Sequence, residues 1–204
     1  MPEKFDTSSN YWDTRYQLGG TSGSGSYGRL AELKAEVINN FVETNNVLSV
    51  IEFGSGDGNQ LTLARYPAYL GLDVSKEAVA ACQARFQDDP SKRFGLVSDR
   101  HGETAELSMS LDVVYHLVED AVFHSYMADL FDAATRFVIV YSSDKEEQTP
   151  VPHVRHRKFT NWVSAQRPNF QLVEHIPNRY PFDADDPNNT SFADFFVFAK
   201  VKAS

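Results

Sequence analysis

Two carboxylates and three glycines of this sequence stand where apolar runs end. Glu52 follows the mostly apolar run 47–51, which reads as a buried strand, and glycines then occur at every second position from Gly54 to Gly58. Asp73 ends a second apolar run, 69–72, fifteen residues after the last of these glycines. Glycine lets the backbone turn sharply and approach a ligand that a Cβ would block. A carboxylate beside such a turn can accept hydrogen bonds from ribose hydroxyls, so the pattern predicts a nucleotide-like cofactor at the edge of a parallel sheet.

The spacing of the glycines separates two classes of cofactor. A dinucleotide site favours G-x-G-x-x-G, whereas Gly54, Gly56 and Gly58 form G-x-G-x-G, with the third glycine one residue early. Glu52 and Asp57 suit a cation better than a pyrophosphate. On these residues and Asp73, the chain resembles the class I S-adenosylmethionine-dependent methyltransferases, whose ligand carries a cationic amine and no phosphate. The resemblance covers nearly everything after residue 28.

The resemblance implies S-adenosyl-L-methionine as the cofactor and S-adenosyl-L-homocysteine as the product. It assigns the glycine turn to the methionine portion, Asp73 to the ribose and Val74 to the adenine face. It assigns Asp99, after the third strand, to the adenine amino group, although an ordinary turn or helix cap is an equal alternative for that residue. The expected cofactor-binding residues are Glu52, Gly54, Ser55, Gly56, Asp57, Asp73, Val74, Ser98, Asp99 and Leu111.

The segment 111–117, after the fourth strand, resembles the family's fourth motif, between cofactor and acceptor. Methyl transfer is an in-line displacement that needs alignment, and an acceptor hydroxyl must also lose its proton. His116 has a suitable ordinary pKa for that step, and Asp112 or Tyr115 would orient the acceptor. We therefore expect His116, Asp112 and Tyr115 as catalytic residues. The alternative for His116 is a structural role in the loop.

The basic cluster 153–158 follows the fifth strand and is expected to border the acceptor pocket. It could bind a carboxylate or phosphate of the acceptor, or it could be a solvated loop. His153 and His156 are three residues apart, but a metal site needs further ligands that the sequence does not supply, so no metal is predicted.

Alternating strand-like and helix-like stretches predict the elements that position these residues. Strands are expected at 47–53, 68–72, 93–97, 106–111 and 135–141, and helices at 58–65, 75–87, 118–133 and 157–166, after a first helix of about four turns that leads into the first strand. The last two strands, 170–176 and 192–199, have no helix between them and must pair as an antiparallel hairpin or lie apart. The fold class predicted with the resemblance is α/β, a doubly wound, mostly parallel seven-stranded sheet with a final antiparallel strand and helices on both faces.

Residues 1–27 are predicted to be a flexible arm, because the tract 19–26 is rich in glycine and serine. Residues 28–204 are predicted to be a single domain. The arm's aromatic residues Tyr11, Trp12, Tyr16 and Tyr27 could fold over the cofactor as a lid, or could anchor a frayed arm to the surface. The arm's W-x-x-R-Y pattern followed by a Gly/Ser tract is similar to methyltransferase domains of bacterial glycan pathways.

Composition limits the partners and the compartment. The 204 residues carry a net charge of -9, with 28 acidic residues against 19 basic ones, so a nucleic acid partner is disfavoured. Cys82 is the one cysteine, and its apolar neighbours indicate a buried thiol. A polar N-terminus and the lack of a long apolar run predict no signal peptide, no membrane span and a cytoplasmic location. The oligomeric state is left open.

The predicted function is methyl transfer from S-adenosylmethionine to oxygen or nitrogen of a small-molecule or sugar acceptor, from a glycan pathway for example. One alternative is an NAD(P)-dependent oxidoreductase, which the early third glycine disfavours. A second alternative is a non-catalytic module that binds S-adenosylmethionine without turnover. A nucleic acid methyltransferase is the third, and segment 111–117 lacks the Asn/Asp-Pro-Pro-Tyr pattern that amino-methylating members of that class use.

Overall fold

The computed structural model describes residues 5–201, and its centre is a seven-stranded sheet of order β3-β2-β1-β4-β5-β9-β8. The first five strands in chain order pair in parallel, and β9 pairs antiparallel to both of its neighbours. The predicted fold class is therefore confirmed, as is the antiparallel pairing of the last two strands. The strands are β1 Val50–Phe53, β2 Tyr69–Asp73, β3 Lys92–Leu96, β4 Ala105–Leu111, β5 Ala134–Ser142, β8 Phe170–Ile176 and β9 Asp194–Lys200.

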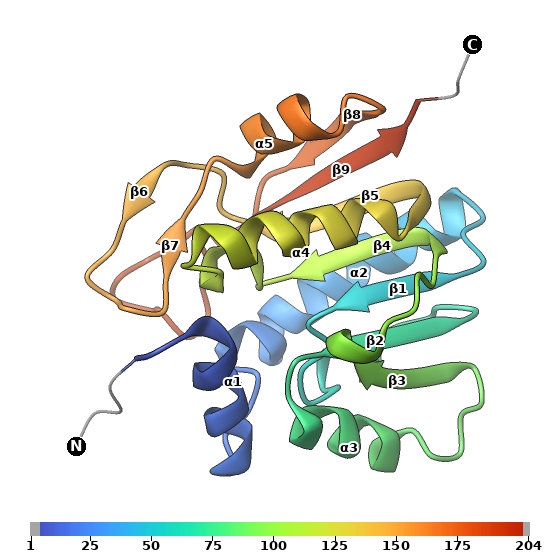
Figure 1. The fold of residues 1–204 in the computed structure, drawn as a ribbon, viewed down its shortest axis with the longest axis horizontal. Coiled ribbons are helices and arrows are strands. Elements are labelled where there is room, and N and C mark those ends of the chain that lie inside the picture. The colour runs from blue at the N-terminus through green and yellow to red at the C-terminus, as the bar shows by residue number, and fades with distance from the viewer. Residues whose placement is uncertain (1–4, 202–204) are drawn as a thin grey trace.

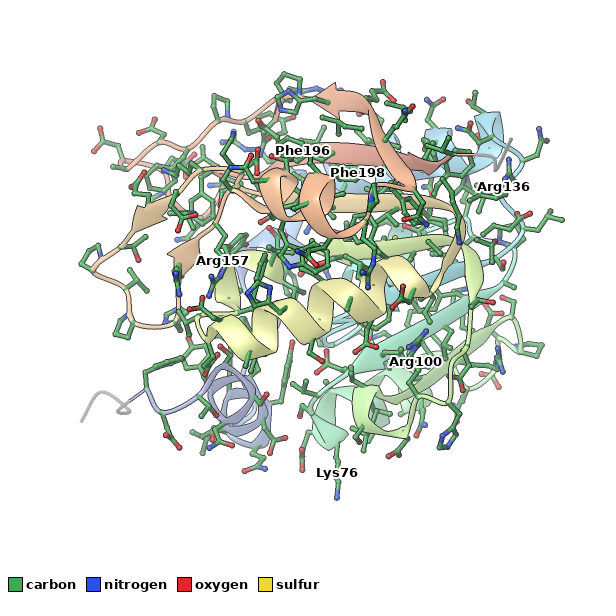
Figure 2. All side chains as sticks on the ribbon, turned by 45° about the horizontal axis from the view of Figure 1, so that its top comes forward. Lys76, Arg100, Arg136, Arg157, Phe196 and Phe198 are labelled. Atoms are coloured by element: carbon green, nitrogen blue, oxygen red, sulfur yellow. The ribbon has the colours of Figure 1, made fainter. Side chains whose placement is uncertain are left out.

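Helices cover both faces of this sheet (Figure 1). On one face, α4 (Asp120–Asp132) and α5 (Phe159–Gln166) pack on an apolar cluster that includes Phe196 and Phe198. Both of these phenylalanines are labelled on β9 in Figure 2. The other face carries α2 (Gly28–Thr44), and there the intervening residues Phe195 and Val197 are buried. Because side chains alternate along a strand, one apolar run supplies both cores.

The carboxyl ends of the parallel strands meet at one edge of the sheet, and two further helices lie near it. In Figure 1 the arrows of β1 and β4 point toward α1 (Ser8–Gln17), and α3 (Lys76–Arg85) follows β2. Short 3-10 turns follow the ends of β3 and β4. Between β5 and α5, a small two-stranded sheet joins β6 (Glu147–Gln148) to β7 (Arg155–His156). None of the helices described here is both long and apolar enough to cross a membrane.

The helix expected over 58–65 is wrong. The structure has only a four-residue 3-10 turn, η2 (Gln60–Leu63), and Ala64 is already extended. Two residues limit this segment: Gly58 has a φ of +74°, outside the helical region, and Tyr66 precedes Pro67, which disfavours a helical conformation at Tyr66. Too few residues remain between them for a stable α-helix.

The N-terminal segment contains structure that the sequence does not predict. Thr7 caps α1 by accepting a hydrogen bond from the Asn10 amide, and a 3-10 turn, η1 (Ser24–Ser26), lies within the Gly/Ser tract. Of α1 only Ser8 is buried, so the helix has no apolar stripe that periodicity could detect. Residues 1–4 of the predicted arm and 202–204 of the predicted domain lie outside the described residues.

Candidate cofactor and acceptor site

A cavity of about 320 Å³ lies where β1, β2 and β4 end. The sheet contributes Glu52 and Asp73 to its wall, α4 contributes Tyr126, and the N-terminal segment contributes Trp12 and Tyr16. Since ligands of open α/β sheets bind outside the carboxyl ends of the strands, this cavity is in the position that a cofactor would take. Its lining includes the predicted residues Glu52, Gly54, Ser55, Gly56, Asp73, Val74, Leu111, Asp112 and His116.

Four predicted site residues do not line this cavity. Ser98 and Asp99 are exposed and bond to each other, while the preceding Val97 lines the wall in their place. Asp57 faces the N-terminal segment, and Tyr115 lines a second cavity, as described below.

Asp73 is held by the backbone of the glycine turn. Its carboxylate accepts hydrogen bonds from the amides of Gly56, at 2.9 Å, and Ser75, at 3.0 Å. The residue is 5% exposed, and burial raises the pKa of its carboxyl group. Each carboxylate oxygen has a second lone pair, so Asp73 can accept further hydrogen bonds from a ligand in the cavity.

Glu52 also lines this cavity, and its carboxyl group has fewer hydrogen-bond partners than that of Asp73. Tyr69 donates its hydroxyl to Oε2 of Glu52 at 2.5 Å. Burial raises the pKa of Glu52 to about 7, against the lowering effects of this hydrogen bond and of Lys34. Nearby, the buried hydroxyl of Ser55 has no hydrogen-bond partner in the described part of the chain. Both groups line the cavity and can bind polar atoms of a ligand.

The glycines allow close contact around the turn. Gly54 has a φ of +87°, and a Cβ there would lie 2.4 Å from Cγ2 of Val113. Gly56 has a φ of +58°, and its Cβ would lie 2.2 Å from Oγ of Ser22. Side chains at these positions are therefore excluded by backbone conformation and by space.

Asp57 fastens the N-terminal segment to the glycine turn. Its Oδ2 accepts hydrogen bonds from the Ser22 amide at 2.9 Å and the Tyr27 hydroxyl at 2.8 Å, while Ser22 Oγ accepts from the Asp57 amide at 2.8 Å. Burial raises the pKa of Asp57, but the hydrogen bonds outweigh it and hold the pKa below its ordinary value. We call Ser22, Tyr27 and Asp57 the latch. Tyr16 joins it through a 2.9 Å hydrogen bond to Ser22 Oγ.

Asp112, after β4, is occupied by structural partners. Its Oδ2 pairs with Nζ of Lys34 at 2.5 Å, and its Oδ1 accepts the Tyr115 hydroxyl at 2.8 Å. Lys34 is 1% exposed and was not predicted as a site residue. Its position could have indicated a buried lysine, because Lys34 follows the buried Leu30 by four residues and therefore lies on the apolar face of α2. These contacts of Asp112 and Tyr115 therefore stabilise the loop that follows β4.

His116 is oriented by a backbone carbonyl. Its Nδ1 lies 2.8 Å from the carbonyl oxygen of His153, which can only accept, so Nδ1 carries the proton and Nε2 has the lone pair. Burial lowers the pKa of His116 to about 4, so the ring is neutral at pH 7. The indole of Trp12 meets this ring edge to face, with centroids 4.9 Å apart. The neutral ring has its lone pair at Nε2, but a pKa of about 4 makes it a weaker base than the ordinary imidazole expected from the sequence.

A second cavity of about 270 Å³ adjoins the first. The two share Trp12, Ser22, Asp112 and His116 as a common wall. The second cavity is also lined by Tyr115 and His153, by Arg15 of α1, and by five residues between β8 and β9: Phe182, Pro187, Thr190, Ser191 and Phe192. His116 therefore lies between the two cavities.

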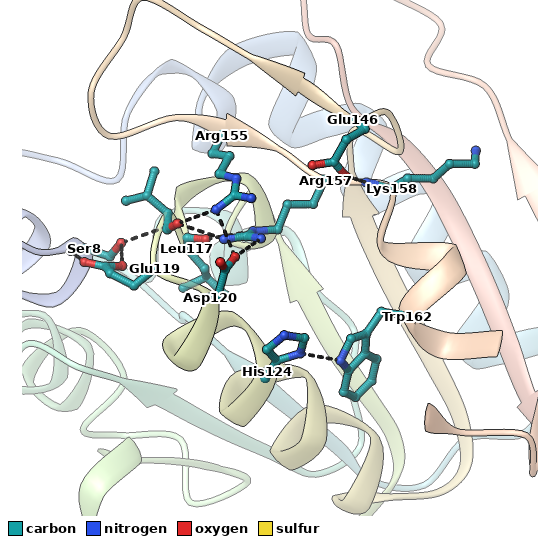
Figure 3. A network of polar contacts seen from close by, with 11 residues as sticks. Ser8, Leu117, Glu119, Asp120, His124, Glu146, Arg155, Arg157, Lys158 and Trp162 are labelled. Carbon is teal, nitrogen blue, oxygen red and sulfur yellow. Dashed lines mark hydrogen bonds and ion pairs between the residues drawn. The ribbon is translucent and has the colours of Figure 1, made fainter. Parts of the chain in front are cut away.

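The basic cluster 153–158 mainly binds other parts of the protein. Arg155 and Arg157 both pair with Asp120 at the start of α4, at 2.9 Å and 2.7 Å, as Figure 3 shows. Arg157 also donates to the carbonyl of Leu117. Of the cluster, His153 and Val154 line the second cavity. Within residues 5–201, no group of three or more His, Cys, Asp or Glu side chains could hold a metal ion.

Cys82 and Tyr126 form hydrogen bonds with backbone carbonyls next to the first cavity. The thiol of Cys82 is buried and donates to the carbonyl of Gly56, and burial raises its pKa to about 12, so it is a poor nucleophile at pH 7. The hydroxyl of Tyr126 lies within hydrogen-bond distance of the carbonyl oxygen of Phe53, at 2.9 Å, and of Ser110 Oγ, at 2.7 Å. Like Lys34, Tyr126 lines the first cavity and was not predicted from the sequence. Only the packing of α4 brings it to β1.

The sheet order, the single antiparallel strand and the cavity at the carboxyl ends define the fold of class I S-adenosylmethionine-dependent methyltransferases. Solved structures of such enzymes share it. Magnesium protoporphyrin IX methyltransferase from Synechocystis PCC 6803, with bound S-adenosylhomocysteine, matches with a TM-score of 0.69 and 14% identity, over 94% of this chain and 97% of that one.

Two further structures match over most of their length. The N-methyltransferase NodS from Bradyrhizobium japonicum WM9, in complex with S-adenosylhomocysteine, has a TM-score of 0.71 and 12% identity, over 97% of this chain and 100% of that one. The methyltransferase domain of bacterial CtHen1 has a TM-score of 0.62 and 18% identity, over 83% and 97%. No family model matches the sequence, and no curated protein matches it. At these identities the similarity establishes the fold.

Proposed function

We propose that this chain is a methyltransferase that moves the methyl group of S-adenosylmethionine to an oxygen or nitrogen atom of a small-molecule or sugar acceptor. The observation that carries the proposal is the arrangement of two adjoining cavities. Asp73 and Glu52 line the first, and His116 stands in the wall between the first and the second. The net charge of -9 favours a small acceptor over a nucleic acid.

The residues of the first cavity fit the cofactor. Asp73 can accept hydrogen bonds from the ribose hydroxyls, and Glu52 can bind the cationic amine of the methionine portion. The hydroxyl of Ser55 is buried without a partner and is available to a ligand. Val74 and Val97 offer apolar surface to a flat base. When bound, the cofactor supplies a methyl group on a positively charged sulfur.

In the proposed mechanism His116 is the base and the residues around it fix its position. The His153 carbonyl holds the Nδ1 proton, so Nε2 can take the proton that the acceptor loses. Asp112 and Tyr115 keep the loop in place and are not themselves the base, because both oxygens of Asp112 are engaged. Trp12 packs against the His116 ring and excludes water from that side.

We also propose that residues 1–27 act as the lid of the first cavity. Trp12 and Tyr16 line it, and the latch joins this segment to the glycine turn. A ligand in the first cavity would exchange with solvent when the latch opens. Closure of the segment would then complete the walls of the cofactor site and of the acceptor site at the same time, since Trp12 and Ser22 line both cavities.

Calorimetric titration with S-adenosylhomocysteine tests the cofactor assignment. Asp73→Ala removes the ribose acceptor and is expected to weaken binding by about tenfold or more, since hydrogen bonds to charged groups contribute roughly 1.5–3 kcal/mol. Asp99→Ala is the matched control, because Asp99 lies outside the cavity. The affinity of this variant for S-adenosylhomocysteine should stay within about twofold of wild type. Circular dichroism verifies that both variants are folded.

Three other results, from this titration, from titrations with other ligands and from an activity assay, would change the assignment. Binding of NAD⁺ or NADP⁺ in place of the sulfur ligand would indicate an oxidoreductase. Binding of S-adenosylmethionine with no methyl transfer to any acceptor of a broad panel would indicate the non-catalytic module. Equal affinities of wild type and Asp73→Ala would remove Asp73 from the cofactor site.

A further inference from the structure

We propose that the second cavity binds a single-ring hydroxy compound carrying a negatively charged group, with that group at Arg15 and the reacting hydroxyl at His116. This inference rests on the proposed function and adds to it the class of the acceptor. The volume, the charge and the hydrogen-bonding groups of the second cavity each support one part of it.

The volume suits a ligand of about one ring. The second cavity measures about 270 Å³, slightly below the usual range of about 300–1,000 Å³ for sites of drug-sized ligands. Aromatic side chains of Tyr11, Trp12, Phe182 and Phe192 line it. Tyr11 stacks on His153 with centroids 4.3 Å apart, and Phe192 meets Tyr115 edge to face at 4.8 Å. These fixed aromatic walls suit a ring-shaped ligand.

The charge of the lining favours an anion. Asp112 is the one carboxylate among the lining residues, and it is paired with Lys34. Arg15 also lines the cavity, and within residues 5–201 its guanidinium makes no ion pair. Its Nε donates to the carbonyl of Thr21 at 2.6 Å, which leaves the terminal nitrogens for a ligand. An unpaired arginine in a chain of net charge -9 can bind a carboxylate or phosphate through two parallel hydrogen bonds.

The protonation of His116 favours a hydroxyl at the reacting position. With Nδ1–H committed to the His153 carbonyl, Nε2 can only accept a hydrogen bond, so the group facing it must donate one. In the reaction the acceptor oxygen forms a bond to the methyl carbon as the sulfur–methyl bond breaks. The hydroxyl proton passes to Nε2 and then to water, and the products are the methyl ether and S-adenosylhomocysteine.

The test compares anionic ring compounds with uncharged compounds that have the same ring. Binding of glucuronate, glucose 1-phosphate and 4-hydroxybenzoate is measured by calorimetry, with and without saturating S-adenosylhomocysteine, beside glucose and phenol as uncharged counterparts. At least one anionic ligand is expected to bind about tenfold or more tightly than its uncharged counterpart. The sugar acids, the sugar phosphate and the phenolic acid distinguish the possible sources of the ring and of the charge.

Variants of Arg15 connect that preference to the second cavity. Arg15→Met keeps the apolar stem and is expected to abolish the preference, whereas Arg15→Lys keeps the charge and retains part of it. Arg93→Met is the matched control, because Arg93 is exposed on the edge strand β3 and lines neither cavity. For a ligand that the protein methylates, Arg15→Met should raise KM by about tenfold and change kcat less.

The proposal is overturned if no anionic ligand binds more tightly than its counterpart, or if Arg15→Met keeps the preference. Failure of the proposed function gives a different result, since S-adenosylhomocysteine itself would not bind to the wild type. Arg15→Met should leave the affinity for S-adenosylhomocysteine within about twofold, because Arg15 does not line the first cavity.

Discussion

Glu52 and Asp73 are carboxyl groups of one cavity, but their surroundings differ. Asp73 accepts two backbone amides, which stabilise its charge. Among residues 5–201, Glu52 has only the Tyr69 hydroxyl as a hydrogen-bond partner, and burial raises its pKa to about 7. Glu52 is therefore a carboxyl group that changes its charge near neutral pH, and a cationic ligand beside it would favour the ionised form.

Glu52→Gln tests this shift through the pH dependence of stability. Because the pKa in the folded state lies above the ordinary 4.5, wild type should lose stability relative to the variant as pH rises from about 4.5 to 7. The expected change in the difference of unfolding free energies is on the order of 3 kcal/mol. Urea unfolding of ligand-free protein across this range measures it, with the exposed Glu174→Gln as control. A constant difference between wild type and Glu52→Gln would contradict the shift.

Among the elements, the N-terminal segment is connected to the rest of the domain by polar contacts and by aromatic contacts of Tyr11 and Trp12. Ser22 and Asp57 exchange two hydrogen bonds, and the Ser8 amide of α1 donates to Glu119 at 2.8 Å, just before α4. Contacts of this kind can open locally without unfolding the core. The segment is therefore suited to move while the sheet stays intact.

Ser22→Ala removes part of the latch and should increase the mobility of the segment. The Asp57 amide loses its acceptor, which costs about 1–3 kcal/mol. We expect faster hydrogen exchange over 8–17 and dissociation of S-adenosylhomocysteine faster by about tenfold. Ser24→Ala is the matched control, since the Ser24 hydroxyl makes no hydrogen bond within the described residues. Exchange and dissociation unchanged in Ser22→Ala would show that the segment is a fixed anchor and not a lid.

At the scale of the whole molecule, stability comes from two apolar cores on opposite faces of the sheet. Phe198 belongs to the core under α4 and α5, where its ring lies 5.5 Å from that of Phe131. The latch and both cavities lie at the edge of the sheet, outside the centre of this core. Ligand binding and global stability should therefore respond to different substitutions.

Phe198→Ala should destabilise the protein by about 3–5 kcal/mol, because it leaves a cavity in a close-packed core. Phe182→Ala is the comparison: this ring is 54% exposed at the second cavity, and we expect a change of about 0.5 kcal/mol or less. Urea unfolding monitored by tryptophan fluorescence gives both values. Similar destabilisation by the two substitutions would mean that the segment 182–192 is part of the folding core.

The strands and most helices were predictable because their signals are local. Segment 170–176 was predicted with the bounds that β8 has, and α4 and α5 lie within the predicted helices 118–133 and 157–166. The small β6–β7 sheet and α1 were missed, since neither has apolar periodicity. The expected helix at 58–65 does not form, because Gly58 has a positive φ and Pro67 disfavours a helical conformation at Tyr66.

The doubly wound sheet and the glycine turn next to Asp73 could be predicted from the sequence, because alternation and backbone conformation depend on neighbouring residues. The contacts of these residues depend on the tertiary structure. It paired Lys34 with Asp112, turned Asp57 toward Ser22, left Asp99 outside the cavity and brought Arg15 to the second cavity. Such contacts join residues far apart along the chain, and they follow from how the helices pack on the sheet, which periodicity does not specify.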